Sequence, residues 1–283
     1  FPLSPIIGTA QFGSWTSEMA PQMAKVYHPD GKPLHYGEIF RNPLLANNLS
    51  AIAKDGAAAF YEGEIAQAIV KKSQELGGKM GLRDLKDHTA NWVDPVSTNY
   101  RGWDVWEIPP NGQGISVLQI LNMLELFDIG SMQPNSAEQL HLFIEAKKLA
   151  YEDRAVYYAD PEFADVPVKL LISKEYAKAR AKLIDPKRAA MDVKYGDPKL
   201  DSDTIYMCAA DGEGNMISYI QSNYAGFGSR ICPDGCGFVI QGRGEGCSLD
   251  PKHRCTLEPH KRPFHTIIPA FMTKDSRPVM AFG

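Results

Sequence analysis

Two hydroxyl residues stand at matching positions in the segment DSDTIYMCAADGEGNMISYIQS. Its two apolar runs are separated by DGEG, a pattern typical of a β-hairpin. With GEG as the loop, Asp211 faces Asn215, and counting back along both strands places Thr204 opposite Ser222. Directly opposed residues have Cβ atoms about 4.5–5.5 Å apart, so the sequence predicts that these two hydroxyls can share a hydrogen bond.

The Thr204 hydroxyl has a structural and a chemical interpretation. Threonine favours strands, so a threonine at the start of a strand needs no further explanation. It becomes a nucleophile when a base lies beside it, and a free α-amine on the same residue can be that base. Such an amine requires cleavage of the bond between Asp203 and Thr204. The preceding segment DVKYGDPKLDSD is polar, and exposed polar segments tolerate a break in the chain.

The elements that would position these residues change in character along the chain. The first two thirds carry apolar residues three and four apart, and several such runs end on glycine, which predicts helices. From about Asp203 onward the pattern alternates as in strands. Helices followed by strands favour a layered α+β fold. The helical runs are residues 42–56, 60–78, 114–128, 140–160 and 169–184, and the later β-type runs are 204–210, 215–222, 237–241, 265–272 and 278–282.

Three local patterns carry narrower predictions. Residues 96–110 alternate like a strand and stop at a double proline. The sequence Asn111–Gly114 that follows is predicted to be a turn lining the cleft. Asn135 and Glu138 form a capping pair for the long helix after them. Near its end, Asp153 and Arg154 are predicted to form a structural ion pair or cap.

The composition excludes several classes of protein. The chain has 283 residues, a net charge of −4 and 44% hydrophobic residues, which is typical of a globular protein. No basic stripe indicates nucleic-acid binding, and no apolar run reaches the ~18 residues of a membrane span. The abrupt ends FPLSPIIGTA and PVMAFG predict a longer parent chain.

The cysteines give little support to a metal site. Cys232, Cys236, Cys247 and Cys255 lie near His253 and His260, but their spacing matches no standard zinc pattern. With Cys208 they make an odd number, which favours scattered thiols or a disulfide over a regular framework. A reduced, cytoplasmic compartment is favoured, and the localisation is otherwise open.

Four motifs in order resemble the γ-glutamyltransferase (γ-glutamyltranspeptidase) family of N-terminal-nucleophile hydrolases. The resemblance runs along nearly the whole chain. It comprises PPNGQGISVLQILNMLELFD, the long helix EAKKLAYEDRAVYYADPEF, the segment DTIYMCAADGEGNMISYIQSNYAGFGS and the Lys-Arg-Pro motif in KRPFHTIIPAF. The third segment is similar to the start of the family's small subunit.

This resemblance implies a four-layer αββα sandwich and self-cleavage between Asp203 and Thr204. Residues 1–203 would be a mainly helical large-subunit part and residues 204–283 a β-rich small-subunit part, both within one sandwich domain. Thr204 would be the nucleophile, and Ser222 would be the supporting hydroxyl. No metal or organic cofactor is implied. The partners are a γ-glutamyl or related acyl-amide substrate and the other part of the same proenzyme; a homodimer is left open.

The residues that match the family's substrate pocket depart from its pattern. Tyr224 stands where the family has an asparagine, and Arg243 where it has a glutamine. Gly246 replaces the carboxylate expected to pair with the α-ammonium of glutamate. His265 and Thr266 replace a pair of serines.

These departures change which acyl group the pocket is expected to accept. An arginine presents a rigid donor fork that suits a carboxylate and repels an ammonium. The pocket with Arg243 is therefore expected to accept a glutaryl-like acyl group more readily than γ-glutamyl. Glu245 would receive an ammonium or neutralise Arg243. The resemblance implies hydrolysis or transfer of a γ-glutamyl group. Two alternatives are a glutaryl or cephalosporin acylase, and a non-catalytic, unprocessed homologue. The family's oxyanion-hole glycines and its carboxylate-binding arginine are expected beyond Gly283 and before Phe1.

Overall fold

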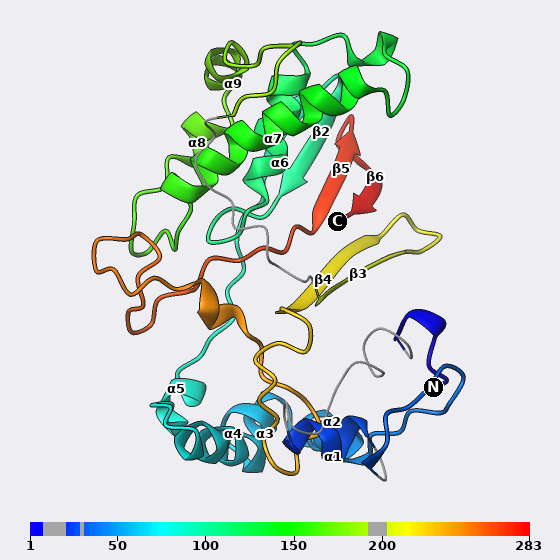
Figure 1. Cartoon of the computed structure of the whole chain (residues 1–283), viewed down its shortest axis with the longest axis vertical. Helices are drawn as coiled ribbons and strands as arrows, with labels where there is room; N and C mark the ends of the chain where they lie inside the picture. Colours follow the sequence, from blue (N-terminus) through cyan, green and yellow to red (C-terminus); the bar gives the residue numbers. More distant parts are fainter. Residues whose placement is uncertain (8–20, 29–30, 192–202) are drawn as a thin grey trace. The chain divides into compact units, whose positions relative to one another are not determined.

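The computed structural model describes residues 1–7, 21–28, 31–191 and 203–283, arranged in two compact units (Figure 1). Unit 1 comprises Phe1–Asn91 and Asn223–Gly242, and unit 2 comprises Trp92–Ser222 and Arg243–Gly283. The predicted segment 192–202 lies outside the described residues, as does the side chain of Asp203.

Unit 1 is helical. Asn42 caps α2 through its side chain, which accepts a hydrogen bond of 3.0 Å from Leu45 N–H. Helix α4 buries Ile65 and Ile69 against Cys236 in a small apolar core. The helices are α1 (Pro21–Tyr27), α2 (Pro43–Asp55), α3 (Ala57–Tyr61), α4 (Glu64–Glu75) and α5 (Leu82–Lys86).

The segment Asn223–Gly242 crosses unit 1 without forming the strand predicted at 237–241. Side-chain amides fix its backbone instead: Asn42 donates to Gly237 O and Asn48 to Cys236 O, each at 2.6 Å. At Gly237, φ is +70° and an added Cβ would lie 2.5 Å from Asn42 Oδ1, so only glycine fits. The strand prediction was wrong here because side-chain amides bind the backbone at Cys236 and Gly237, and Ile240 pairs with the nearby turn, donating to Ile231 O at 2.8 Å and accepting from Ser229 N–H at 2.9 Å.

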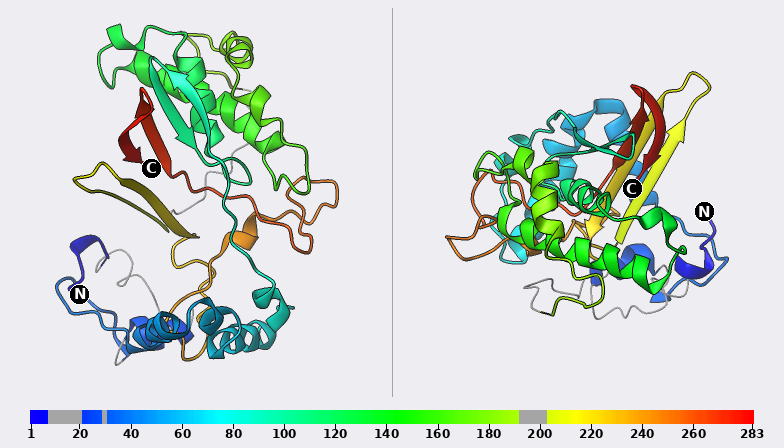
Figure 2. Two further views of the ribbon diagram at one scale, coloured as in Figure 1. Left: turned by 180° about the vertical axis from the view of Figure 1, so that it is seen from behind. Right: turned by 90° about the horizontal axis from the view of Figure 1, so that it is seen from above.

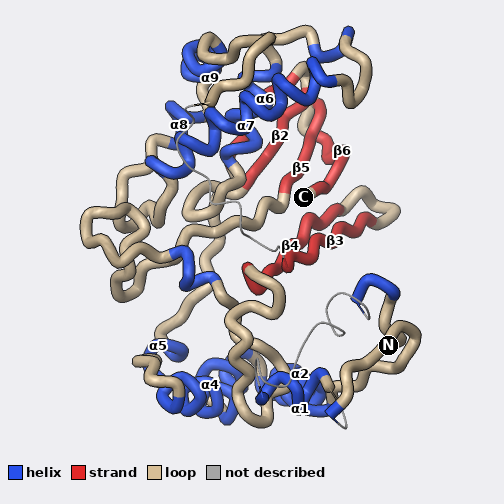
Figure 3. Tube along the Cα trace, in the orientation of Figure 1, coloured by secondary structure: helices blue, strands red, loops and turns tan. Residues whose placement is uncertain are grey.

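Unit 2 contains a four-stranded antiparallel sheet in the order β1-β2-β5-β6. The strands are β1 (Val96–Tyr100), β2 (Trp103–Glu107), β5 (Ala270–Lys274) and β6 (Arg277–Phe282). The single strand predicted over 96–110 is a hairpin. Arg101 and Gly102 adopt φ of 54° and 88°, the left-handed pair that a tight two-residue hairpin turn requires. Figure 3 shows β2, β5 and β6 side by side.

Helices cover one face of this sheet, as the views from behind and above also show (Figure 2). Ile115 and Leu118 of α6 pack against Val105 of β2, and a second core joins α6 to α7 and α9. The helix α7 begins one residue later than predicted, because Ser136 rather than Asn135 caps it by accepting from Gln139 N–H at 3.3 Å. The elements are α6 (Ile115–Leu124), η3 (Ile129–Ser131), α7 (Ala137–Tyr157), α8 (Val168–Leu171), α9 (Lys174–Ala181) and η4 (Arg243–Gly246).

The predicted hairpin is confirmed as β3 (Asp203–Ala210) and β4 (Met216–Tyr224). Asp211 N–H donates to Asn215 O at 3.1 Å, and the Asp211 carboxylate accepts from Glu213 N–H and Asn215 N–H. These bonds hold the pairing that the count from the GEG loop predicts. The mixture of helices and antiparallel strands confirms the α+β class.

Candidate active site

Thr204 and Ser222 meet at the open end of the β3–β4 hairpin. Thr204 Oγ1 donates a hydrogen bond of 2.9 Å to Ser222 Oγ, which confirms the proximity predicted from the hairpin count. Thr204 is exposed, whereas Ser222 is partly buried. The structure thus presents an accessible hydroxyl, at the second residue of β3, whose orientation is fixed by a second hydroxyl.

The hairpin is anchored to the last strand of unit 2. Tyr206 shares a hydrogen bond of 3.0 Å with Ser218, and the Ser218 hydroxyl donates to Phe282 O at 3.3 Å. Gly283 fits tightly beside Tyr206, because an added Cβ would lie 2.6 Å from its ring and 2.8 Å from Ile268 O. Glycine is therefore required where β6 ends against β3, two residues along β3 from Thr204.

Arg243 and Thr266, both predicted to bind substrate, are in direct contact. Arg243 Nη1 donates to Thr266 Oγ1 at 3.0 Å, and the Arg243 side chain is only 1% exposed. Glu245 lies in the same 3-10 turn, η4, but is exposed. The structure thus joins two of the predicted residues and leaves Glu245 at the surface.

The neighbouring His265 is held as a neutral imidazole. Burial, and then the nearby Arg243 guanidinium, lower the pKa of His265 to about 4. Its backbone N–H donates to Asn111 O at 3.0 Å, and its Nδ1 accepts a long bond of 3.5 Å from Ile267 N–H. His265 therefore adds no positive charge beside Arg243 near neutral pH.

The chain returns to the hairpin just before Arg243. Gly242 N–H donates to Asn223 O at 2.9 Å, which closes the segment that leaves unit 2 after Ser222 and re-enters it at Arg243. Consecutive Cα atoms are 3.8 Å apart, so this bond limits the Cα separation of Ser222 and Arg243 to at most roughly 13 Å. The backbone positions that carry the hydroxyl pair and the Arg243–Thr266 pair are therefore separated by no more than this distance at Ser222 and Arg243, within unit 2.

Tyr224 ends β4 in a strained conformation. Its φ is +82°, a left-handed value that is rare for a bulky residue and is typical of positions held by functional constraint. Tyr224 belongs to unit 1, whereas the other predicted site residues, including Ser222 and Arg243, belong to unit 2.

The turn at 111–114, which the sequence predicts to line the cleft, supplies two side chains that contact the segment 263–266. Asn111 Nδ2 donates to Pro263 O at 2.6 Å, and Gln113 Nε2 donates to Thr266 O at 2.7 Å. Arg154 Nη1 donates to Gln113 Oε1 at 2.7 Å, and the Arg154 carbonyl accepts from Tyr158 N–H at 3.1 Å where α7 ends. Of the ion pair or cap predicted for Asp153 and Arg154, the structure thus has a cap at Arg154 and no ion pair between the two. Asp153 pairs instead with Arg180, at 3.1 Å.

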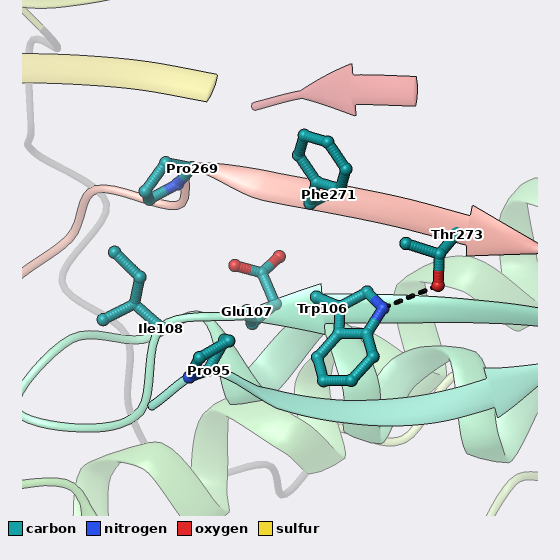
Figure 4. Close-up of a pocket in the computed structure, with 7 residues that line it drawn as sticks. All are labelled: Pro95, Trp106, Glu107, Ile108, Pro269, Phe271 and Thr273. Atoms are coloured by element: carbon teal, nitrogen blue, oxygen red, sulfur yellow. Dashed lines mark hydrogen bonds between the residues drawn. The ribbon is translucent and has the colours of Figure 1, made fainter. Parts of the chain in front are cut away.

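A cavity of about 340 Å³ lies at the end of β2 (Figure 4). Trp106 Nε1 donates to Thr273 Oγ1 at 2.9 Å across its wall. Glu107 is 1% exposed, and neither carboxyl oxygen has a hydrogen-bond partner among the described residues. Burial raises the pKa of Glu107 to about 8, so the carboxyl is protonated at neutral pH. The lining residues are Pro95, Trp106, Glu107, Ile108, Pro269, Phe271 and Thr273.

The cysteines are free thiols in this structure. Within the described ranges, no group of three or more His, Cys, Asp or Glu side chains is placed to hold a metal ion. None of the helices formed by the described residues is both long and apolar enough to cross a membrane.

This α+β fold is that of the N-terminal-nucleophile hydrolases. The profile of the Gamma-glutamyltranspeptidase family matches residues 7–283, and the chain belongs to that family. It is 40% identical to the Glutathione hydrolase-like YwrD proenzyme of Bacillus subtilis (strain 168) over 263 residues, covering 93% of this chain and 49% of that protein.

The names of two further relatives refer to other compounds, oxamate and cephalosporin. The Oxamate amidohydrolase proenzyme of Klebsiella pneumoniae is 33% identical over 93% of this chain and 49% of its own length. The crystal structure of cephalosporin acylase from Bacillus halodurans has a TM-score of 0.88 and 37% identity, covering 99% of this chain and 52% of that one. The chain thus spans about half the length of the relatives it matches.

Proposed function

We propose that this chain is part of a self-processing amidohydrolase in which Thr204 is the nucleophile and Ser222 orients it. The observation that carries the proposal is the 2.9 Å hydrogen bond between the exposed Thr204 hydroxyl and Ser222. The names of its relatives, which are proenzymes of hydrolases and acylases, support the same reaction class.

Processing would begin with attack of Thr204 Oγ1 on the carbonyl carbon of Asp203. The Asp203–Thr204 C–N bond breaks as a C–O ester bond forms, and the amide nitrogen takes a proton to become the free α-amine. Water then hydrolyses the ester, leaving a carboxylate on Asp203 and restoring the Thr204 hydroxyl. The products are residues up to 203 and residues from 204 onward, which would remain associated as the two parts of one enzyme.

In turnover the new α-amine would act as the general base. It takes the hydroxyl proton as Oγ1 attacks the substrate amide, and it returns a proton to the leaving amine when the tetrahedral intermediate collapses. An acyl-threonine ester results, and water or a second amine releases the acyl group. No step requires a metal or an organic cofactor. Ser222, by accepting the Thr204 hydrogen bond, would restrict Oγ1 to one orientation.

The acyl group best suited to this site carries a terminal carboxylate, as in glutaryl. Arg243 is buried and its Nη1 contacts the Thr266 hydroxyl, so guanidinium and hydroxyl together form a donor group for an anion. His265 is neutral there, and Gly246 supplies no carboxylate to bind an ammonium.

A γ-glutamyl group is the second candidate. It has an α-carboxylate that Arg243 could bind and an α-ammonium that needs an acidic partner. Glu245, two residues from Arg243 in η4, is the acidic residue nearest in sequence. Because Glu245 is exposed, its attraction for an ammonium would be screened by water, which makes this acyl group the weaker candidate.

The test compares glutaryl and γ-glutamyl p-nitroanilides as substrates of the purified full-length protein. A higher kcat/KM for the glutaryl substrate is expected. Equal or better turnover of the γ-glutamyl substrate would overturn the acyl assignment while keeping the nucleophile. A protein that is neither cleaved before Thr204 nor active on either substrate would overturn the proposed function and indicate the non-catalytic alternative.

A further inference from the structure

A chain of hydrogen bonds leads from the end of α7 to the Arg243–Thr266 pair. Arg154 Nη1 donates to Gln113 Oε1 at 2.7 Å, Gln113 Nε2 donates to Thr266 O at 2.7 Å, and Arg243 Nη1 donates to Thr266 Oγ1 at 3.0 Å. Thr266 is thus held from both sides, by its carbonyl and by its hydroxyl.

Arg154 is itself fixed in orientation. Its guanidinium carbon lies 4.1 Å from the centre of the Tyr151 ring and 5.4 Å from that of Phe264. Contacts of a guanidinium with two aromatic rings restrict the plane of the fork, so its donors point in a fixed direction. Arg154 therefore offers Gln113 a rigid, permanently charged donor.

This donor determines the orientation of the buried Gln113 amide. An arginine only donates hydrogen bonds, so the amide atom facing Arg154 must be the oxygen. The Gln113 NH₂ group is then directed to the Thr266 carbonyl, which can only accept. Gln113 is 7% exposed, so water competes weakly for either bond.

The surrounding backbone is held by other bonds. His265 N–H donates to Asn111 O at 3.0 Å and Asn111 Nδ2 to Pro263 O at 2.6 Å, both without Gln113. Loss of the Gln113 amide would leave Asn111 bonded to the segment 263–265, but it would allow the Thr266 carbonyl to shift. The consequence would be concentrated at the Thr266 hydroxyl and at Arg243.

We propose that Arg154 and Gln113 are positioning residues that set the acyl specificity of the site, by fixing Thr266 so that its hydroxyl orients Arg243 toward the carboxylate end of the acyl group. This inference rests on the proposed function and extends it to two residues outside the acyl pocket. The pair would act on recognition of the distal carboxylate and leave processing at Thr204 unchanged.

Gln113→Glu is the sharpest test. It keeps an oxygen for Arg154 but replaces the donor to Thr266 O with a second oxygen. We would measure kcat and KM of the full-length protein for glutaryl and pentanoyl p-nitroanilides, which differ in the distal carboxylate. KM for the glutaryl substrate is expected to rise about tenfold or more, with pentanoyl turnover little changed. Arg154→Met should give the same loss of preference, and Arg154→Lys a smaller one.

We call the hydrogen-bonded series Arg154–Gln113–Thr266 the relay. Arg254→Gln is the matched control, because the Arg254 guanidinium carbon also lies near a ring of α7, 6.0 Å from the centre of Tyr157. Arg254 donates to Asp165 O, which is not part of the relay. The Arg254→Gln variant should keep the glutaryl preference. Glutarate has no amide bond to cleave, so calorimetric binding of glutarate to the processed wild type and to processed Gln113→Glu protein gives a second readout that requires no catalysis.

The outcomes separate the two proposals. If the wild type prefers glutaryl but Gln113→Glu and Arg154→Met keep that preference and the glutarate affinity, the relay is overturned and the proposed function stands. If the wild type neither prefers glutaryl nor binds glutarate, the acyl assignment fails and the relay fails with it. If Gln113→Glu does not fold, the Arg154 variants decide.

Discussion

Thr204 Oγ1 lies 2.9 Å from Ser222 Oγ although the two residues are 18 positions apart in the sequence. The hairpin turn at Asp211–Asn215 sets this distance, because it fixes which residues of β3 and β4 face each other. The body of the hairpin is in turn linked to β6 through Ser218 of β4 and Phe282. The hydroxyl pair therefore depends on a local turn and on the packing of the hairpin against β6.

Removing the Thr204 hydroxyl should abolish both processing and hydrolysis. Thr204→Ala lacks the attacking oxygen, so the full-length protein should stay uncleaved and lose at least about 1000-fold in kcat. Thr204→Ser keeps the oxygen and should be cleaved, at a lower rate.

Ser222→Ala removes only the orienting acceptor and should slow hydrolysis about tenfold. Gel analysis and anilide hydrolysis measure both effects, with Ser131→Ala as control; processing of Thr204→Ala would contradict the assignment.

The Thr266 hydroxyl should matter for anionic acyl groups alone. Thr266→Val keeps the branched shape and removes the acceptor of Arg243 Nη1. We expect kcat/KM for glutaryl p-nitroanilide to fall about five- to tenfold, with the pentanoyl substrate changed less than about twofold. An equal loss for both substrates would show that Thr266 supports the fold of the site rather than carboxylate recognition.

Gly283 should tolerate no side chain. An alanine Cβ there would lie 2.6 Å from the Tyr206 ring, so Gly283→Ala must displace the hairpin or the end of β6. Overpacking of this kind should lower the free energy of unfolding by about 1–3 kcal/mol and slow processing at Thr204. Gly212→Ala is the control, since no atom lies within 4 Å of a Cβ built at Gly212. Equal melting temperatures for the two variants would contradict the packing described for Gly283.

Glu107 should make the protein less stable as the pH rises. Its folded-state pKa, about 8, lies above the ordinary pKa of 4.5 for a glutamate side chain. Between these values the folded state holds a proton that the unfolded chain releases. The contribution of Glu107 to the free energy of unfolding is therefore highest below pH 4.5 and falls until about pH 8. Glu107→Gln removes this dependence. The gain in the free energy of unfolding that it gives over the wild type should be about 2–4 kcal/mol larger at pH 8 than at pH 5.

Denaturant unfolding of the wild type and Glu107→Gln at both pH values measures the difference. Glu213→Gln, at an exposed position in the hairpin loop, serves as the control. Parallel pH profiles for the wild type and Glu107→Gln would show that the Glu107 carboxyl ionises normally.

The sequence predicted features that depend on short segments. The β3–β4 hairpin followed from one turn signature, and the helix α2 from apolar spacing and its terminal Gly56. The turn at Arg101–Gly102 was missed because the alternation of β1 continues into β2 without an obvious break. Its signal was the glycine, which takes a φ of 88°.

Tertiary contacts account for what the sequence did not predict in the site. Arg154 was expected to pair with its neighbour Asp153, but helical side chains one residue apart point in different directions. Asp153 faces α6 and α9, whereas Arg154 reaches Gln113. No local pattern identifies Gln113 as the link to Thr266, because the two are separated by 153 residues and meet only in the folded unit.

If Thr204 becomes an N-terminal nucleophile, the chain must split before it. Intact-mass analysis of the full-length protein after purification and incubation, with N-terminal sequencing of any fragment, would detect the split. We expect two fragments, the second beginning at Thr204, and no cleavage in the Thr204→Ala variant. A single unbroken mass that persists for days, or a fragment that begins at another residue, would show that Thr204 is not the nucleophile.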